Sequence, residues 1–211
     1  MIDVVQQINA VRRQVGSQVI EAGQARTVII SQVYPVPAED LWDACTSPER
    51  IRRWFLPVSG DLRPGGHYQL EGNAGGTVQA CEPPNRFSAS WEFGGQVSWI
   101  EVRLTPGRRG TRLQIEHLIP ADERWAEFGP GAVGVGWDMA LLGLAGHLSS
   151  GAAVSPEEGA AWAASPEGRQ FMTLSSQRWE KADAVAGTDA STARAAAERT
   201  IAAYTGAAPA S

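Results

Sequence analysis

The sequence predicts an α+β domain in which an antiparallel sheet of about six strands is covered by one long helix near the C-terminus. Five extended segments between residues 67 and 120 are separated by turn residues, with Gly-Gly or Pro-Pro pairs at most of the breaks, which is typical of an antiparallel meander. Residues 131–151 then carry apolar side chains at helical spacing, as in a single long helix. Strands followed by such a helix favour this fold class, with the helix on one face of the sheet.

The first strand of the sheet is predicted ahead of the meander. Residues 26–34 are rich in β-branched side chains and run into two prolines in the stretch "YPVP". Two short helices are predicted next. The segment "AEDLWDACT" has acids in its first turn, where the helix dipole favours them. The segment "SPERIRRW" begins with a serine N-cap and a proline at the first helical position.

Helical segments are predicted on both sides of this domain. Residues 1–22 place apolar side chains at alternating spacings of three and four, which indicates an amphipathic helix. We interpret it as packed on its own domain, with a dimer contact as the alternative. Residues 152–206 contain a capping box of Ser155 and Glu158, a second Ser-Pro-Glu start and an alanine-rich helix stopped by glycine. We interpret them as a helical extension packed on the domain of residues 26–150.

Composition and charge exclude several classes of protein. The 211 residues are 43% hydrophobic and 19% charged, which fits one globular core with additions. The net charge of -5 argues against a nucleic-acid partner, because such proteins usually carry a positive excess. No run of ~18 apolar residues occurs, so membrane insertion is not expected. The N-terminus lacks the features of a secretory signal, and we therefore expect a cytoplasmic protein.

No metal or other cofactor is expected from the motifs. Cys45 and Cys81 form no CxxC pair, and the three histidines show no paired spacing of the kind that zinc sites use. The stretch "GPGAVG" at residues 129–134 matches the dinucleotide pattern, but it does not follow a buried strand. The stretch "EGNAGGT" lacks the lysine of a phosphate loop and is interpreted as a hairpin turn.

Alternation along the last three strands predicts which side chains face the long helix. The inner faces are expected to carry Phe87, Ala89, Trp91, Phe93, Ile100, Val102, Leu104, Leu113, Ile115 and His117. The outer faces are expected in solvent and carry Ser88, Ser90, Glu92, Glu101, Arg103, Arg112, Gln114 and Glu116. An apolar space that contains one or two polar groups, such as an imidazole, is typical of a small-molecule pocket.

Five segments in order resemble a known family. They are "SPERIRRWFLP", "RPGGHYQL", "CEPPNRFSASWEF", "GTRLQIEH" and "GVGWDMALLGLAGHL". Over about residues 26–150 the chain resembles the START or SRPBCC superfamily with its helix-grip fold and, more narrowly, the family named after the activator of the heat-shock-protein-90 ATPase. The resemblance implies that the second short helix lies at the mouth of a cavity. Trp54 and Phe55 would then line the entrance, and Arg50, Arg52 and Arg53 would spread onto its rim.

These features together predict binding of a small hydrophobic or aromatic molecule between the sheet and the long helix. The expected cavity wall consists of Trp54, Phe55, Tyr68, Trp91, His117, Trp137 and Leu141. One alternative is a cyclase-like or dehydratase-like enzyme that acts on a polyketide-like substrate in the same cavity, as some members of the superfamily do. No catalytic residue is assigned, because no serine-histidine-acid or cysteine-histidine motif is legible. A second alternative is a chaperone-regulating or other protein-interaction module, and a homodimer through the N-terminal helix or the C-terminal extension is a further option.

Overall fold

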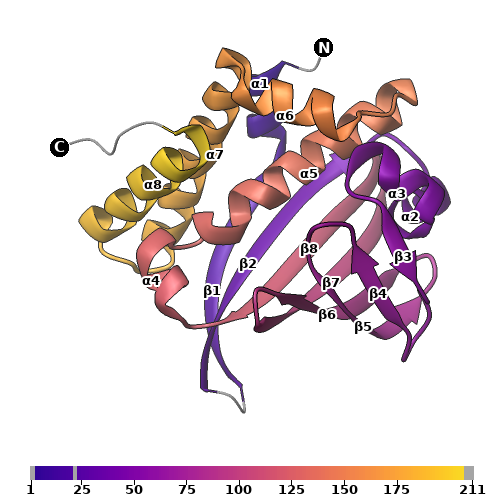
Figure 1. Ribbon diagram of the computed structural model, residues 1–211, viewed down its shortest axis with the longest axis horizontal. Coiled ribbons are helices and arrows are strands. Elements are labelled where there is room, and N and C mark those ends of the chain that lie inside the picture. Colours follow the sequence, from indigo (N-terminus) through magenta and orange to yellow (C-terminus); the bar gives the residue numbers. More distant parts are fainter. Residues whose placement is uncertain (1–2, 21–22, 207–211) are drawn as a thin grey trace. The chain divides into compact units, whose positions relative to one another are not determined.

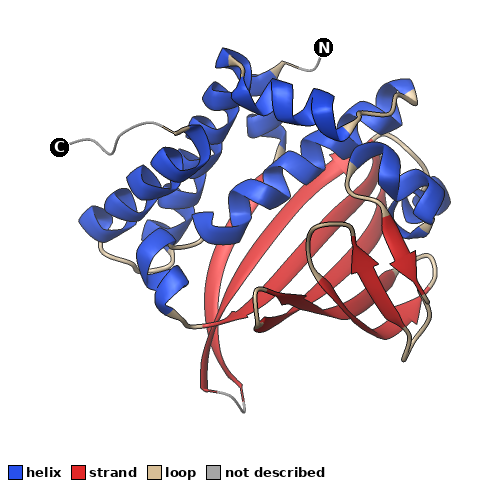
Figure 2. Ribbon diagram, viewed as in Figure 1, coloured by secondary structure: helices blue, strands red, loops and turns tan. Residues whose placement is uncertain are grey.

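The computed structural model describes residues 3–20 and 23–206 (Figure 1). Figure 2 distinguishes the helices from the strands by colour. Their order is α1 (Val4–Ala10), β1 (Arg12–Ile20), β2 (Gly23–Tyr34), α2 (Ala38–Thr46), α3 (Pro48–Trp54), β3 (Val58–Gly60), β4 (His67–Leu70), β5 (Gly75–Glu82), β6 (Arg86–Phe93), β7 (Gln96–Gly107), β8 (Gly110–Pro120), α4 (Glu123–Phe128), α5 (Gly131–Ser150), α6 (Pro156–Ala164), α7 (Pro166–Val185) and α8 (Ala190–Thr205).

The strands form one sheet of eight, in the order β1-β2-β8-β7-β6-β5-β4-β3. The α+β class and the antiparallel meander are confirmed, but the sheet has two strands more than the six predicted. The extra strands are β1 and β3. Strand β3 has three residues, too few for a period to be recognised in the sequence. Along β6 and β7 the register is continuous from Arg86 opposite Arg103 to Phe93 opposite Gln96.

The predicted helix over residues 1–22 is wrong for most of its length. Only Val4–Ala10 is helical, Arg12–Ile20 is a strand, and residues 1–2 and 21–22 lie outside the described residues. A spacing of four residues suits one face of a helix and one face of a strand alike. The composition of this segment favours a strand over a helix. Gly16 weakens a helix, and the β-branched residues Val15, Val19 and Ile20 favour a strand.

The chain divides into two compact units, and both draw residues from the segment predicted as residues 26–150. The helical unit consists of Met1–Ile30, Ala121–Met139 and Ser155–Ser211. The sheet unit consists of Ser31–Pro120 and Ala140–Val154. Strand β2 and helix α5 are continuous elements whose residues are shared between the two units.

In the helical unit, α7 is the central helix and packs against α1, β1, α6 and α8. Its Phe171, Met172 and Trp179 are almost completely buried. The segment predicted as a helical tail is helical, with α6, α7 and α8 between Pro156 and Thr205. Helix α6 begins with the predicted capping box, in which the Ser155 Oγ accepts from the Glu158 amide and the Glu158 carboxylate accepts from the Ser155 amide.

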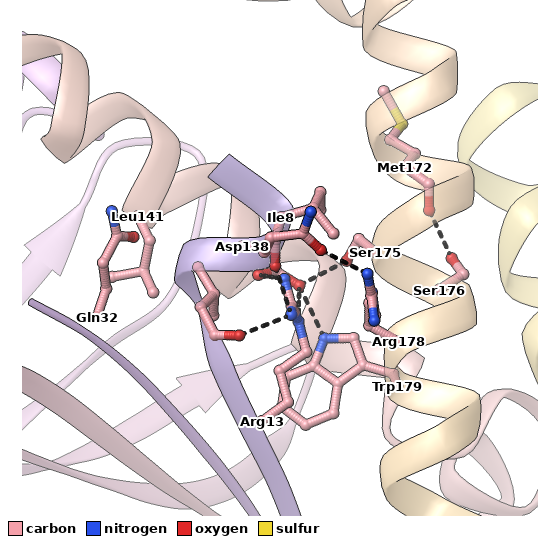
Figure 3. Close-up of polar contacts among 12 residues, drawn as sticks. Ile8, Arg13, Gln32, Asp138, Leu141, Met172, Ser175, Ser176, Arg178 and Trp179 are labelled. Atoms are coloured by element: carbon pink, nitrogen blue, oxygen red, sulfur yellow. Dashed lines mark hydrogen bonds and ion pairs between the residues drawn. The ribbon is translucent and has the colours of Figure 1, made fainter. Parts of the chain in front are cut away.

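A buried ion pair holds the first half of α5 within the helical unit (Figure 3). Arg13 of β1 binds Asp138 through two parallel bonds, Nε to Oδ2 at 2.9 Å and Nη2 to Oδ1 at 2.7 Å. From α7, the Ser175 Oγ donates to Oδ2 at 2.6 Å and the Trp179 Nε1 donates to Oδ2 at 3.0 Å. The Arg13 Nη1 also donates to the carbonyl of Ile8. These bonds stabilise a carboxylate that is 1% exposed.

Small residues on α5 allow the other helices of this unit to approach closely. A Cβ atom at Gly134 would overlap with the Trp179 ring, and one at Gly131 would overlap with Thr200 of α8. These glycines and Asp138 lie at spacings of three and four, so they share one face of α5.

In the sheet unit, the predicted inner faces of β7 and β8 are buried, including Ile100, Val102, Leu113 and Ile115. Two residues of β6 depart from the prediction. Phe93 is 51% exposed, because it ends the strand at the Gly94–Gly95 turn. Ser90 was expected in solvent but is buried, because its Oγ accepts from the Thr77 amide of β5.

Among the described residues, no helix is both long and apolar enough to span a membrane.

Candidate functional site

The sheet unit carries a buried imidazole on its inner face. His117 of β8 is 2% exposed, and its ring meets the Trp91 ring of β6 edge to face, with the ring centres 6.0 Å apart. The His117 Nε2 lies 2.8 Å from the Oγ of Ser98, which is directly opposite Trp91 in the pairing of β6 with β7. Three neighbouring strands therefore converge on one polar point in a largely apolar face.

The hydrogen bonds of Ser98 indicate which ring nitrogen of His117 carries the proton. The Ser98 hydroxyl donates to the Trp91 carbonyl at 3.0 Å. A hydroxyl has one proton, so the bond to His117 requires the imidazole to donate from Nε2. This assignment gives the neutral tautomer that carries its proton on Nε2.

Burial keeps this imidazole neutral. Desolvation of the charged form lowers the pKa of His117 to about 4. The neighbouring Glu116 is on the opposite face of β8, as alternation predicts, so no carboxylate beside it in the chain favours the charged form. At neutral pH the site therefore contains an uncharged imidazole, which has one nitrogen that donates a hydrogen bond and one that accepts.

Aromatic residues at the end of α3 form a second group in the same unit. Trp54 and Phe55 stack with ring centres 5.6 Å apart and an angle of 27° between the rings. The Trp54 Nε1 donates to the Ala44 carbonyl of α2 at 3.0 Å. A Cβ atom at Gly143 of α5 would overlap with the Trp54 carbonyl oxygen, so α3 and the second half of α5 are in close contact.

The arginines of α3 are not equivalent. Arg52 is exposed and pairs with Glu49 on the same helix at 2.5 Å. Arg50 turns inward instead, where it binds Asp40 and Asp43 of α2. The Arg50 guanidinium thus binds two carboxylates on the neighbouring helix, and the spread of the three arginines onto a cavity rim stays a prediction.

Tyr68 is half-buried on β4, which lies next to the edge strand β3. Its hydroxyl donates to the Ser90 carbonyl at 2.7 Å, across the side-chain-free Gly76 that is its partner on β5. Burial and the nearby Glu92 raise its pKa, so the hydroxyl keeps its proton. Tyr68 and Glu92 also line a surface pocket of about 460 Å³ together with His67 and Gln69.

The two predicted wall residues on α5 belong to different units. Leu141 is 1% exposed and lies in the sheet unit, where its carbonyl accepts a bond from the Tyr34 hydroxyl at 3.1 Å. Trp137 is 9% exposed and lies in the helical unit. The structure thus brings Trp91 together with His117 and stacks Trp54 on Phe55, while a common wall for all seven residues stays a prediction.

Several buried polar residues of the sheet unit were missed, among them Ser98, Gln32 and Tyr34. Ser98 shares the inner face of β7 with Ile100, and Gln32 and Tyr34 share one face of β2. The Tyr34 hydroxyl lies 3.3 Å from the Gln32 Oε1. The alternation that placed His117 also places these residues inward, and extending it to polar side chains would have found them.

In the described part of the chain, no three histidine, cysteine or acidic side chains are grouped closely enough to hold a metal ion. Burial raises the pKa of the Cys45 thiol to about 12, so the thiol keeps its proton at neutral pH.

Comparison with known families identifies this arrangement. The family described as activator of Hsp90 ATPase homolog 1-like protein matches residues 35–149, which is more than half of the chain. The chain belongs to this family. As a member of the activator of Hsp90 ATPase homolog 1-like family it has the START or SRPBCC fold that the sequence motifs indicated.

Solved structures extend the likeness beyond the family segment. The crystal structure of CalU16 from Micromonospora echinospora is 38% identical, with a TM-score of 0.64, and the match covers 85% of this chain and 99% of CalU16. The solution structure of CalU16 gives a TM-score of 0.69 over 85% and 97% of the two chains. This coverage exceeds residues 35–149, so part of the terminal segments outside the family match is shared with CalU16.

Less similar structures share the fold. DynU16, from the dynemicin biosynthetic locus, is 23% identical with a TM-score of 0.56, over 60% of this chain and 48% of that one. Protein MLL2253 from Mesorhizobium loti is 26% identical with a TM-score of 0.53, over 59% of this chain and 97% of its own. Among curated proteins there is no match.

Proposed function

We propose that this member of the family binds a small hydrophobic or aromatic molecule between the curved sheet and the second half of α5. The observation that carries the proposal is the neutral, buried His117, held by Ser98 against the Trp91 ring on an apolar inner face. A buried polar group in apolar surroundings is costly unless its hydrogen bonds are made. An imidazole in such a place is suited to orient one polar group of an otherwise apolar ligand.

The proposed wall in the sheet unit combines this centre with Trp54, Phe55, Tyr68 and Leu141. Apolar burial supplies the affinity, at roughly 25 cal/mol for each Å² removed from water. His117 and the Tyr68 hydroxyl would orient the ligand through hydrogen bonds, and both are uncharged at neutral pH. Trp137 is proposed as a further wall residue from its position one turn before Leu141 on α5.

A cyclase-like or dehydratase-like activity on a polyketide-like substrate is the second candidate. DynU16, which shares the fold, belongs to the dynemicin biosynthetic locus. A neutral imidazole in an apolar cavity can take or return a proton during such a reaction, so His117 is the group that would act. A chaperone-regulating role, suggested by the name of the family, needs no cavity and is the third candidate.

Native mass spectrometry of the freshly purified protein tests the binding proposal. We expect an added mass that is released on denaturation and can be identified in an organic extract. An emptied sample is then titrated with naphthol and with the larger dihydroxyanthraquinone, following tryptophan fluorescence. Saturable binding of either probe supports the proposal, while the absence of both an added mass and probe binding would overturn it.

A pair of tryptophan variants locates the site. Trp91 lies on the inner face of the sheet, and Trp99 lies on the outer face of the adjacent strand. Trp91→Leu should weaken probe binding about tenfold, because the aromatic contact with the ligand is lost, and Trp99→Leu should leave it unchanged. Equal effects of the two variants would place the probe elsewhere.

The variant His117→Gln separates the binding proposal from the enzyme candidate. An enzyme would lose turnover of the extracted compound, while a carrier would lose only affinity for it.

A further inference from the structure

A row of four residues crosses the outer face of the sheet near its β3 edge. Ser59 of β3 is directly opposite Gln69 of β4. Gln69 is in turn opposite Gly75 of β5, and Gly75 is opposite Glu92 of β6. Residues that pair in this way share one face of a sheet. Glu92 follows the inward Trp91 on the same strand, so the row lies on the outer face.

Gly75 leaves a gap in the middle of this row. Neighbouring strands are about 4.8 Å apart, so Gln69 and Glu92 stand about 10 Å from each other with the side-chain-free Gly75 between them. The whole row lines a surface pocket of about 460 Å³, and Ser59 and His67 complete its wall on the β3 side. A volume of this size suits a small molecule.

The hydrogen bonds of Gln69 determine which end of its amide borders the gap. Its Nε2 donates to the Leu70 carbonyl at 2.7 Å and to the Asn73 carbonyl at 2.8 Å, so both of its protons are used. Its Oε1 lies next to the gap, because a Cβ atom at Gly75 would come within 2.6 Å of it. Among the described residues no group donates to this oxygen, which is therefore a free acceptor.

The carboxylate of Glu92 is a second acceptor, on the other side of the gap. The buried Ser90 holds it, since the Ser90 Oγ donates to Glu92 Oε1 at 2.8 Å and accepts from the Thr77 amide at 2.8 Å. Within the described part of the chain, Glu92 pairs with no arginine, lysine or histidine and its Oε2 accepts no bond. Glu101, on the same face, is instead paired with Arg86. The row thus contains a positioned negative charge that the protein does not neutralise.

We propose that this row binds the primary ammonium group of a small organic amine over Gly75, between Gln69 Oε1 and the Glu92 carboxylate. An ammonium group has donors only, and both groups that border the gap are acceptors. Its charge compensates the carboxylate, and a bond between two charged groups is stronger than one between neutral groups. The site is on the opposite face of the sheet from His117, so it is separate from the binding proposed above.

Three small probes separate the charge from the donors that the site requires. Cyclohexylamine is protonated at neutral pH and has both a charge and N–H donors, cyclohexanol has a donor without charge, and tetramethylammonium has charge without a donor. Each is titrated into the protein at constant ionic strength, following the backbone amide signals of Gly75, Gly76 and Thr77 by nuclear magnetic resonance. We expect saturable shifts with cyclohexylamine and about tenfold weaker binding of the other two. No saturable shift with cyclohexylamine, or equal binding of either analogue, would overturn the proposal.

Two variants of the row test where the amine binds. Glu92→Gln keeps the shape of the side chain and an acceptor for Ser90 but removes the charge, so it should weaken cyclohexylamine binding about tenfold. Gly75→Ala places a methyl group in the gap and displaces the Gln69 amide, so it should abolish binding. Thermal denaturation of both variants checks that the fold is kept.

Glu116→Gln is the matched control for the charge. Glu116 is on the same outer face, on β8, and lies opposite Glu101 instead of lining the pocket. This variant lowers the net negative charge of the protein by the same amount as Glu92→Gln, and it should bind cyclohexylamine as the wild type does. Equal losses in the two variants would show a general effect of charge and would overturn the site, as would unchanged binding by Glu92→Gln.

Discussion

Arg13 and Asp138 form a buried, two-bond ion pair across 125 positions of the sequence. Their side chains are 4% and 1% exposed. Removing two such charges from water is expensive, and the pair is stable only because other bonds complete it. The donors are Ser175 and Trp179 of α7, so β1, α5 and α7 meet at one carboxylate.

Asp138→Asn should strongly destabilise the protein. The change leaves the Arg13 guanidinium buried without a negative partner, which costs about 3–5 kcal/mol of unfolding free energy. Urea denaturation measures this cost. The double variant Arg13→Met with Asp138→Leu should recover most of the loss, because it removes both charges. A single variant within about 1 kcal/mol of the wild type would show that the ion pair does not hold this unit together.

Two adjacent serines of α7 offer a matched comparison. Both Ser175 and Ser176 are 0% exposed, but only Ser175 donates to Asp138, whereas Ser176 donates to the Met172 carbonyl of its own helix. Ser175→Ala should lower the free energy of unfolding by about 1.5–3 kcal/mol, because a bond to a charged group is lost. Ser176→Ala should cost less than about 1 kcal/mol, since its bond duplicates one the helix already makes. The reverse ranking in thermal denaturation would contradict this role for Ser175.

Two glycines of α5 should respond in opposite directions to the same change. A Cβ atom at Gly134 would overlap with the buried Trp179 ring, so Gly134→Ala should destabilise the protein by about 1–3 kcal/mol. At Gly136 the nearest atom to a new Cβ is the Tyr204 hydroxyl oxygen at 3.8 Å, which is an ordinary contact. Gly136→Ala should therefore stabilise the helix by up to about 1 kcal/mol. Melting temperatures of the two variants decide the point, and equal shifts would contradict it.

Acidification should destabilise the fold through His117. Its pKa is lowered to about 4 in the folded protein, while an unfolded histidine titrates at about 6.5. The unfolded chain therefore binds the proton first, so stability is full above about pH 6.5 and falls as the pH drops toward about 4. The total loss is about 3 kcal/mol, and His117→Gln should lack this part of the pH dependence. Parallel curves for the two proteins in urea denaturation at several pH values would disprove the assignment.

The strands of the meander and the long helix could be predicted because their patterns are local. Alternation placed His117 and Trp91 on the inner face without knowledge of the fold. The roles of Arg50 and Asp138 could not be obtained in this way, since their partners lie on other elements, up to 125 positions away. The single aspartate in the apolar helix α5 nevertheless indicated a buried ion pair, because a buried carboxylate needs a cation and hydrogen-bond donors. The helix predicted over residues 1–22 was wrong for Arg12–Ile20, since pairing with β2 outweighs an ambiguous spacing.

The carboxylate of Asp138 also has a consequence for the order in which the protein matures during synthesis. Arg13 is made before Asp138, and Ser175 and Trp179 are made after both. The strands β3 to β8 are by then complete and can pair as they emerge. The helical unit must instead wait for α7, so strand β1 stays without its buried partners until that helix has been made.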